Sequence, residues 1–310
     1  MAGLKPSAVP PHVFAVDGDR LRYARFHPDR RGLELREYWS EDLEPGLFPE
    51  GQLAGPARDA HRLDEALKAL LERSSLTVHE ASLVLPDRWL RLASTEAADV
   101  PRKGRDRAEV IRFKLKRLVP FRVEDLRVAD LEAAGTDDSG ARLLLGFASE
   151  ALLTQLEDVF AGNGVRIGQL SNEGLSLLVA LQGALAGQET GVLLHATNES
   201  YSVIVARRGA PILHRFKSLT QTEPNWDLVV RDLKLTRRFV VSQSQVVPLA
   251  EVTFVGSPEV EAGWSRAVER AFEVPVRSVA SEWEEIPGTV EGVSPVQAAP
   301  LLGAAARTIR

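Results

Sequence analysis

The side chains best suited to catalysis or metal binding are scattered along this sequence. The six histidines stand at positions 12, 27, 61, 79, 195 and 214. They form none of the H-x-H, H-x-x-x-H or H-E-x-x-H spacings that bring two imidazoles to one metal ion. The sequence also lacks G-x-S-x-G, G-x-x-x-x-G-K-S/T and G-x-G-x-x-G, which mark nucleophile elbows, phosphate-binding loops and dinucleotide folds. The residues alone therefore predict no catalytic residue, no metal site and no particular class of enzyme.

The densest basic stretch runs from Arg102 to Arg122 and holds nine basic side chains against two acids. A helix of this kind can bind nucleic-acid phosphates or anionic lipid headgroups. Aromatic side chains that stack on bases are limited to Phe113 and Phe121, so we favour a simpler interpretation, the solvated face of a packed helix. A second basic cluster receives the same interpretation; it comprises Arg231, Lys234, Arg237 and Arg238.

The composition limits the kinds of protein that can position these side chains. The chain has 310 residues, 44% of them hydrophobic and 26% charged, with a formal net charge of −5 and no cysteine. This length predicts two compact domains or one domain of two lobes. The lack of cysteine excludes disulfides, thiolate metal sites, iron–sulfur clusters and a cysteine nucleophile. Residues 1–11 do not resemble a secretory signal, and the longest apolar stretch, 175–186, is too short for a bilayer span, so we expect a soluble, cytoplasmic protein.

A β-meander is predicted twice. From Val13 the sequence VFAVDGDRLRYARFHPDRRGLELREYW has three apolar runs separated by turn residues, and Asp17-Gly18 is a strong hairpin signal. From Gly191 the sequence GVLLHATNESYSVIVARRGAPILHRFK repeats this arrangement. Recurrence of one unit after about 180 residues indicates a duplicated architecture.

Helices and further strands are predicted around the two meanders. Apolar residues at helical spacing mark helices at 62–74, 152–160, 108–118 and 257–272. Ser294, Pro295 and Gln297 combine an N-cap, a first-turn proline and a capping-box glutamine ahead of a last helix. Strand-like segments are 80–86, 89–93, 143–148, 165–170 and 252–256. The alternation predicts an α/β or α+β protein of two lobes.

Several segments, taken in order, resemble the PilM family of pilus-assembly proteins. The strand at 81–86 ends in Leu-Pro, and the following helix runs into KRLVPFRVEDL at 116–126. LLLGFA at 143–148 is followed by a helix and the turn AGNGV at 161–165, as in the family. AAPLLGAA at 298–305 is similar to the terminal helix of the family. The similarity extends from about residue 13 to the C-terminus.

The resemblance implies an α/β fold of the actin-like type, a ribonuclease H-like duplication. Each of its two lobes opens with a β-meander, and the first lobe carries a small α+β insert. It implies a first lobe at 12–165 with the insert at about 76–150, a second lobe at 166–293, and a helix at 294–310 that packs back on the first lobe. The division protein FtsA and the cytoplasmic domain of the secretion protein GspL are relatives with this fold.

The resemblance also implies a function. Proteins of this family are scaffolds of type IV pilus machines, and their relatives serve type II secretion, at the inner face of the inner membrane. They capture the cytoplasmic tail of a membrane partner such as PilN, and they can bind ATP between the lobes. We expect such a tail to dock as an extended peptide on a strand edge beside the insert, at residues that the sequence does not identify. The choice between pilus and secretion machine stays open, as does assembly into homo-oligomers.

The first phosphate-binding motif expected from the resemblance is altered. The family carries a D-x-G-[ST]-x-x-x-K turn in its first hairpin, whereas residues 17–20 here read DGDR. This turn has no hydroxyl and no following lysine, and its extra acid, Asp19, would repel phosphate.

The second motif is altered as well. It aligns with residues 194–196, LHA, where apolar Leu194 replaces the aspartate that would hold Mg²⁺. The adenosine-side pair of glycines is partly kept as Gly256-Ser257. These changes predict a non-catalytic scaffold that uses no cofactor. The vestigial nucleotide site comprises Asp17, Gly18, Gly256 and Ser257.

Two alternatives remain at this point. The first is a working ATPase of the same fold, with ATP and Mg²⁺ as ligands, in which Asp17 serves the metal and Gly256 the adenosine. The second is a nucleic-acid or membrane-surface module that acts through the basic helix around Lys114. The second alternative predicts binding that falls steeply with salt.

Overall fold

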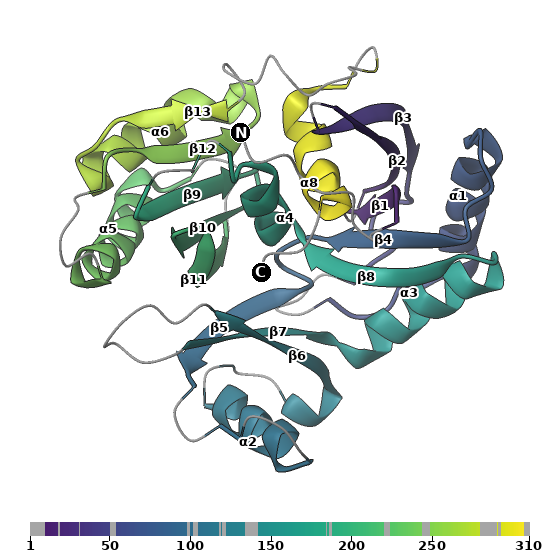
Figure 1. The fold of residues 1–310 in the computed structure, drawn as a ribbon, viewed down its shortest axis with the longest axis horizontal. Helices are drawn as coiled ribbons and strands as arrows, with labels where there is room; N and C mark the ends of the chain where they lie inside the picture. Colours follow the sequence, from purple (N-terminus) through teal and green to yellow (C-terminus); the bar gives the residue numbers. More distant parts are fainter. Residues whose placement is uncertain are drawn as a thin grey trace.

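The computed structural model in Figure 1 describes most of the chain. The described residues are 10–17, 19–30, 32–49, 54–97, 100–101, 105–117, 119, 122–133, 142–183, 185, 188–219, 224–243, 249–279, 290 and 293–306.

Two five-stranded sheets of the same topology form the body of the molecule. The first has the strand order β3-β2-β1-β4-β8 and the second β11-β10-β9-β12-β13. In each sheet three consecutive strands pair antiparallel, and two later strands add in parallel on one side. The first sheet consists of β1 (His12–Val16), β2 (Arg20–Asp29), β3 (Gly32–Asp42), β4 (Glu80–Leu85) and β8 (Arg166–Asn172). The second consists of β9 (Thr190–Ala196), β10 (Ser200–Arg207), β11 (Ala210–Ser218), β12 (Val252–Gly256) and β13 (Val276–Ser278). The duplication predicted from the two meanders is confirmed.

A third, smaller sheet of order β5-β7-β6 lies between β4 and β8 in the chain. This insert comprises β5 (Arg91–Glu96), α2 (Arg105–Lys116), the 3-10 helix η1 (Val123–Asp125), β6 (Leu126–Ala133) and β7 (Arg142–Ser149). Ile111, Leu115 and Phe147 are part of its own apolar core. The insert also touches the second sheet, because β5 packs against β11 and the guanidinium of Arg91 lies 5.6 Å from the ring centre of Phe216.

Helices cover both faces of each large sheet (Figure 1). Helices α1 (Ala60–Arg73) and α3 (Glu150–Gly162) pack together on the outer face of the first sheet. Helices α5 (Trp226–Gln243) and α6 (Pro258–Phe272) do the same on the second. Between the two sheets lie α4 (Glu173–Ala180) and α8 (Pro295–Ala305), which pack on each other. Among the described residues, no helix combines the length and apolar composition that a bilayer span requires.

The helix ends follow from side-chain capping. In α8, Ser294 and Gln297 form the predicted capping box, each side chain bonding the backbone of the other residue. Asp59 caps α1 by accepting from the backbone N–H of His61. Ser149 caps α3 by accepting from that of Leu152. Each such bond satisfies a backbone donor that the helix itself leaves free.

The strand pairing differs from the sequence-based ranges at two points. Those ranges put residues 80–85 in the insert and 166–172 in the second lobe, whereas both segments are strands of the first sheet, paired in parallel. The apolar run at 80–85 suits this central place, because Leu83 faces the core beneath α1 and α3 while Val84 faces α8. As limits of domains, the ranges 12–165, 166–293 and 294–310 remain predictions.

Candidate functional site

The candidate site lies between the two large sheets, around the start of α4. Each sheet presents a tight hairpin there, β1–β2 and β9–β10. The last strand pairs before the two turns are Val16 with Leu21 and Ala196 with Tyr201. This register makes Asp17 equivalent to Thr197, because each opens a turn, and it makes Arg22 equivalent to Ser202.

Asp17 shapes the first turn through its backbone and its side chain. Its N–H donates to the carbonyl of Arg20 at 3.1 Å, and its Oδ1 accepts from the N–H of Arg20 at 2.9 Å. Its second oxygen, Oδ2, lies 3.0 Å from Nη2 of Arg22. The carboxylate is thus held by the turn on one side and by a guanidinium on the other.

Arg22 joins this turn to the start of α4. The residue is only 8% exposed, and its Nη2 also lies 3.5 Å from Oε1 of Glu173, the first residue of that helix. Burial alone would lower the pKa of Arg22, but Asp17 and Glu173 together raise it. The buried cation therefore stays charged between two carboxylates.

Glu173 has an unusual protonation equilibrium. Its side chain is 16% exposed, and burial together with the charges of Asp87 and Asp17 raises its pKa to about 7, against the opposing effect of Arg22. This carboxyl therefore holds its proton to a higher pH than an exposed glutamate does.

Asp87 ties the first sheet to the second. It follows β4, and its Oδ1 accepts from the backbone N–H of Gly174 at 3.0 Å. Its Oδ2 lies 3.4 Å from Nε2 of His214, a buried residue of β11. Burial alone would raise the pKa of Asp87, but His214, His195 and Ser202 lower it to about 2. The aspartate is therefore ionised and is shared between elements of both halves.

The space around this cluster is filled. A Cβ atom at Gly174 would lie 2.7 Å from Cδ1 of Ile204, 3.0 Å from Oδ2 of Asp87 and 3.1 Å from Nε2 of His214. A larger residue at this position would force these side chains to shift, so glycine permits the close approach of α4 to β10 and β11.

The residues predicted for a nucleotide site are only partly brought into this cluster. Asp17 belongs to it, and Gly18 lies outside the described residues. Gly256 ends β12, paired with Ala196, and a Cβ there would meet the ring of Phe254 at 2.5 Å. Ser257 is the N-cap residue of α6 and makes no side-chain capping bond. In the described part of the chain, the side chain of Asp17 bonds its own turn and pairs with Arg22, not with Gly256 or Ser257.

The alignment of the second hairpin is corrected by the structure. Leu194 lies inside β9 with its side chain fully buried in the core beneath α5 and α6. The turn is opened instead by Thr197, whose Oγ1 accepts from the N–H groups of Glu199 and Ser200 at 3.2 and 3.1 Å. The sequence-based alignment was therefore displaced by three residues.

Four members of the cluster were not predicted from the sequence. They are Arg22, Asp87, Glu173 and His214. The one local signal was the position of Asp87, directly after the buried strand that ends in Leu85-Pro86. Among the described residues, no group of three or more His, Asp or Glu is arranged to hold a metal ion.

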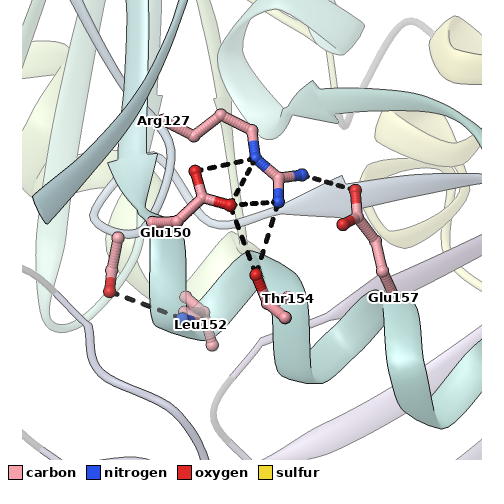
Figure 2. Close-up of polar contacts among 6 residues, drawn as sticks. Arg127, Glu150, Leu152, Thr154 and Glu157 are labelled. Carbon is pink, nitrogen blue, oxygen red and sulfur yellow. Dashed lines mark hydrogen bonds and ion pairs between the residues drawn. The ribbon is translucent and has the colours of Figure 1, made fainter.

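A second polar cluster fixes the insert against the first sheet (Figure 2). Arg127 of β6 donates to Glu150 through Nε and Nη2 and to Glu157 through Nη1, both on α3. Thr154 donates its hydroxyl to Glu150 between them. The hydrogen bonds that Arg127 donates to Glu150 and Glu157 raise its own pKa, and the same arginine lowers the pKa of Glu150.

A groove of about 530 Å³ lies next to this cluster. It is lined by Glu157, Ala161, Gly164, Val165, Arg166 and Ile167. These residues belong to the second half of α3, to β8, the outer strand of the first sheet, and to the short connection between the two. An outer strand presents unpaired backbone groups to which an extended peptide can add.

Comparison with known proteins identifies the fold. No protein-family model matches the sequence, and no curated protein sequence matches it. The structure is similar to a chain of the PilM-PilN type IV pilus biogenesis complex, with 17% identity, a TM-score of 0.73, and 96% of this chain and 98% of that one covered. A Bacteroides thetaiotaomicron protein with an actin-like ATPase fold has 10% identity, a TM-score of 0.54, and 94% of each chain covered. The cytoplasmic domain of EpsL, an inner-membrane component of the type II secretion system of Vibrio cholerae, has 11% identity, a TM-score of 0.49, and 94% and 93% covered. The fold is actin-like, as the resemblance predicted.

Proposed function

We propose that this protein is a non-catalytic adaptor of a type IV pilus or type II secretion assembly platform. In this proposal it works at the cytoplasmic face of the inner membrane and binds the cytoplasmic tail of a PilN-like membrane protein. The observation that carries the proposal is the match over almost the whole length of both chains, at a TM-score of 0.73, to a chain of the PilM-PilN complex. The sequence segments that resemble PilM support it independently.

The groove between α3 and β8 is the docking site that we propose for the tail. It combines an outer strand, which offers main-chain hydrogen bonds, with apolar Ala161, Val165 and Ile167 on its walls. The clamp of Arg127 on Glu157 holds the insert at one side of this groove. A docked peptide would meet a preformed surface, which reduces the entropy lost on binding.

The polar cluster supports a nucleotide site that has lost its function. The two carboxylates nearest the first turn, Asp17 and Glu173, already face the guanidinium of Arg22. A Mg²⁺ ion needs such oxygens free, and a second cation beside the buried arginine would be repelled. The equivalent turn of the second sheet offers the hydroxyl of Thr197 in place of a carboxylate.

Calorimetric titration with a peptide of the PilN-like tail from the same cell tests the docking proposal. Ala161 is exposed on α3, so Ala161→Glu places a charged side chain in the groove without disturbing the core, and we expect the affinity to fall at least tenfold. Ala262→Glu makes the same exchange on an exposed position of α6 and should bind like the wild type. Equal affinity of all three proteins would contradict the assignment of the groove.

Titration with ATP and Mg²⁺ tests the nucleotide site separately. We expect no measurable heat and no shift of the melting temperature. Tight, magnesium-dependent binding would contradict this part of the proposal and favour the working ATPase.

A further inference from the structure

Helix α5 exposes an unusual share of the hydrophobic surface. Six large hydrophobic side chains stand exposed among the described residues, and three of them are Leu228, Leu235 and Val241 of this helix, 60%, 49% and 62% exposed. A group of exposed apolar side chains on a folded protein often marks a surface that binds a partner or a membrane. Leu228, Arg231, Leu235 and Arg238 follow one another at helical spacings of three and four, so leucine and arginine alternate along one face.

The basic side chains of this face have no close ion-pair partner within the described residues. Arg231, Lys234 and Arg238 are all exposed, and no ion pair is formed by them among the described residues. The acids of the same helix are engaged elsewhere. Asp227 pairs with Arg270 of α6, and Asp232 pairs with Arg215 and Lys217 of β11. A positive, partly apolar strip therefore remains on a chain whose net charge is −5.

Helix α1 provides a comparison inside the same molecule. It joins the third strand of the first sheet to the fourth, as α5 does in the second sheet. Its outward charges pair within the helix, Arg62 with Glu65 and Lys68 with Asp64. None of the large hydrophobic side chains found exposed in the described chain lies on α1. The surface of α5 is therefore not a consequence of its place in the fold.

We propose that the outer face of α5 contacts an anionic lipid bilayer. Its residues are Leu228, Arg231, Lys234, Leu235, Arg238 and Val241. Basic side chains attract acidic headgroups, while exposed aliphatic side chains gain by entering the boundary between headgroups and acyl chains. The chemistry favours lipid over nucleic acid, because nucleic acid offers nothing apolar to three aliphatic side chains and binds mainly through charge and aromatic stacking. The face is the convex side of a helix, which fits a deformable surface better than a bound peptide.

Vesicle flotation with the purified full chain tests this proposal without any partner. We expect binding to phosphatidylcholine vesicles that contain roughly one-third phosphatidylglycerol, and little binding to phosphatidylcholine alone. The triple variant Arg231→Gln, Lys234→Gln, Arg238→Gln should bind about a hundredfold more weakly, from roughly a fivefold loss for each charge. Leu228→Ser with Leu235→Ser should bind about tenfold more weakly while keeping the charge.

A matched variant on α1 controls for net charge. Arg62→Gln, Lys68→Gln and Arg73→Gln remove three positive charges from the equivalent helix and should leave vesicle binding within about threefold of the wild type. Equal losses in the two triple variants, or equal binding to neutral and anionic vesicles, would overturn the assignment. So would duplex DNA binding as tight as vesicle binding and unaffected by the leucine changes, since the face would then be a site for nucleic acid. Loss of vesicle binding with intact binding of the partner tail would leave the proposed adaptor function standing.

Discussion

The two halves of the molecule stabilise equivalent turns with different side chains. Asp17 and Thr197 stand at equivalent positions, and each accepts hydrogen bonds from the backbone of its own turn. In the first half the aspartate is accompanied by buried Arg22, whereas Ser202 stands at the equivalent position of the second half. A carboxylate that leaves water needs a counter-ion, and a hydroxyl does not.

This difference shows where the molecule places charge. The first half contributes Asp17, Arg22 and Asp87 to the contact between the sheets, and the second contributes His214 and Ser202. The charged groups are therefore paired with one another and with the other half, and they hold the two halves together.

The largest effect is expected where the two halves share a helix contact. A Cβ at Gly303 of α8 would lie 1.7 Å from the carbonyl oxygen of Ser176 in α4, so the helices touch through their backbones. Gly303→Val should lower the free energy of unfolding by about 4 kcal/mol or more, because the helices must separate. Urea unfolding measures this. The control is Gly162→Ala, at the end of α3, where an added Cβ meets no other part of the protein within 4 Å; it should change the free energy of unfolding by less than about 1 kcal/mol. Similar losses in both variants would show that the contact between α4 and α8 is loose.

The next effect concerns the aspartate shared between the halves. Asp87→Ala should cost about 3 kcal/mol at pH 7, because it leaves the N–H of Gly174 and the ring of His214 buried without their partner. The folded pKa of about 2 lies below the unfolded value of 3.8. The stability it contributes is therefore present above about pH 4 and is lost as the pH falls towards 2.

Urea unfolding of wild type and variant from pH 7 to pH 2 checks this, and the difference between them should shrink at the acid end. Asp227→Ala, which removes an exposed ion pair with Arg270, should change stability by less than about 1 kcal/mol. A difference for Asp87→Ala that stays constant with pH would contradict the ionised state of this residue.

A smaller effect of opposite sign is expected at Glu173. Its folded pKa of about 7 exceeds its ordinary value of 4.5, so the folded protein keeps a proton that the unfolded chain releases. Stability should therefore fall as the pH rises from about 4.5 to 7, by at most about 3 kcal/mol from this group. Glu173→Gln should remove that slope, and thermal unfolding at pH 5 and pH 8 measures it. A slope that is unchanged in the variant would show that other groups cause it.

The smallest effect is expected at the neutral turn. Thr197→Val keeps the shape of the side chain but removes the hydroxyl that bonds Glu199 and Ser200, and it should cost about 1 kcal/mol. Asp17→Asn should cost about 2 kcal/mol, since Arg22 loses a charged partner while buried. Equal costs in urea unfolding would remove the distinction between the two turns.

Local patterns in the sequence were sufficient to predict much of the fold. The hairpin at Asp17, the repeated meander and the capping box at Ser294 all depend on residues close together in the chain, and all three are confirmed. The strand predicted at 89–93 lies instead at Arg91–Glu96, because the apolar Trp89 is not part of a strand. It lies in a turn after Pro86 and packs its ring 4.4 Å from that of Phe48.

The polar cluster was not predictable in the same way. Asp87 and His214 meet only because β4 and β11 belong to different sheets that face each other, and no local spacing records this. Helix α5 was expected only as a packed helix with a solvated basic face at Arg231, Lys234, Arg237 and Arg238, and its bounds were not predicted. The exposure of its Leu228, Leu235 and Val241 was not predicted, because aliphatic residues at helical spacing ordinarily indicate a buried face.

The cover that α8 gives the first sheet has a consequence for the order of synthesis. The inner face of this sheet, with Val13, Phe26 and Val84, is buried by Leu301 and Ala304 from a helix that leaves the ribosome long after the strands. The outer face has its own helices much earlier, in α1 and α3. A nascent chain therefore carries a half-covered apolar sheet through most of translation, a state that invites aggregation or chaperone binding. Truncation before α8 would make that exposed state permanent.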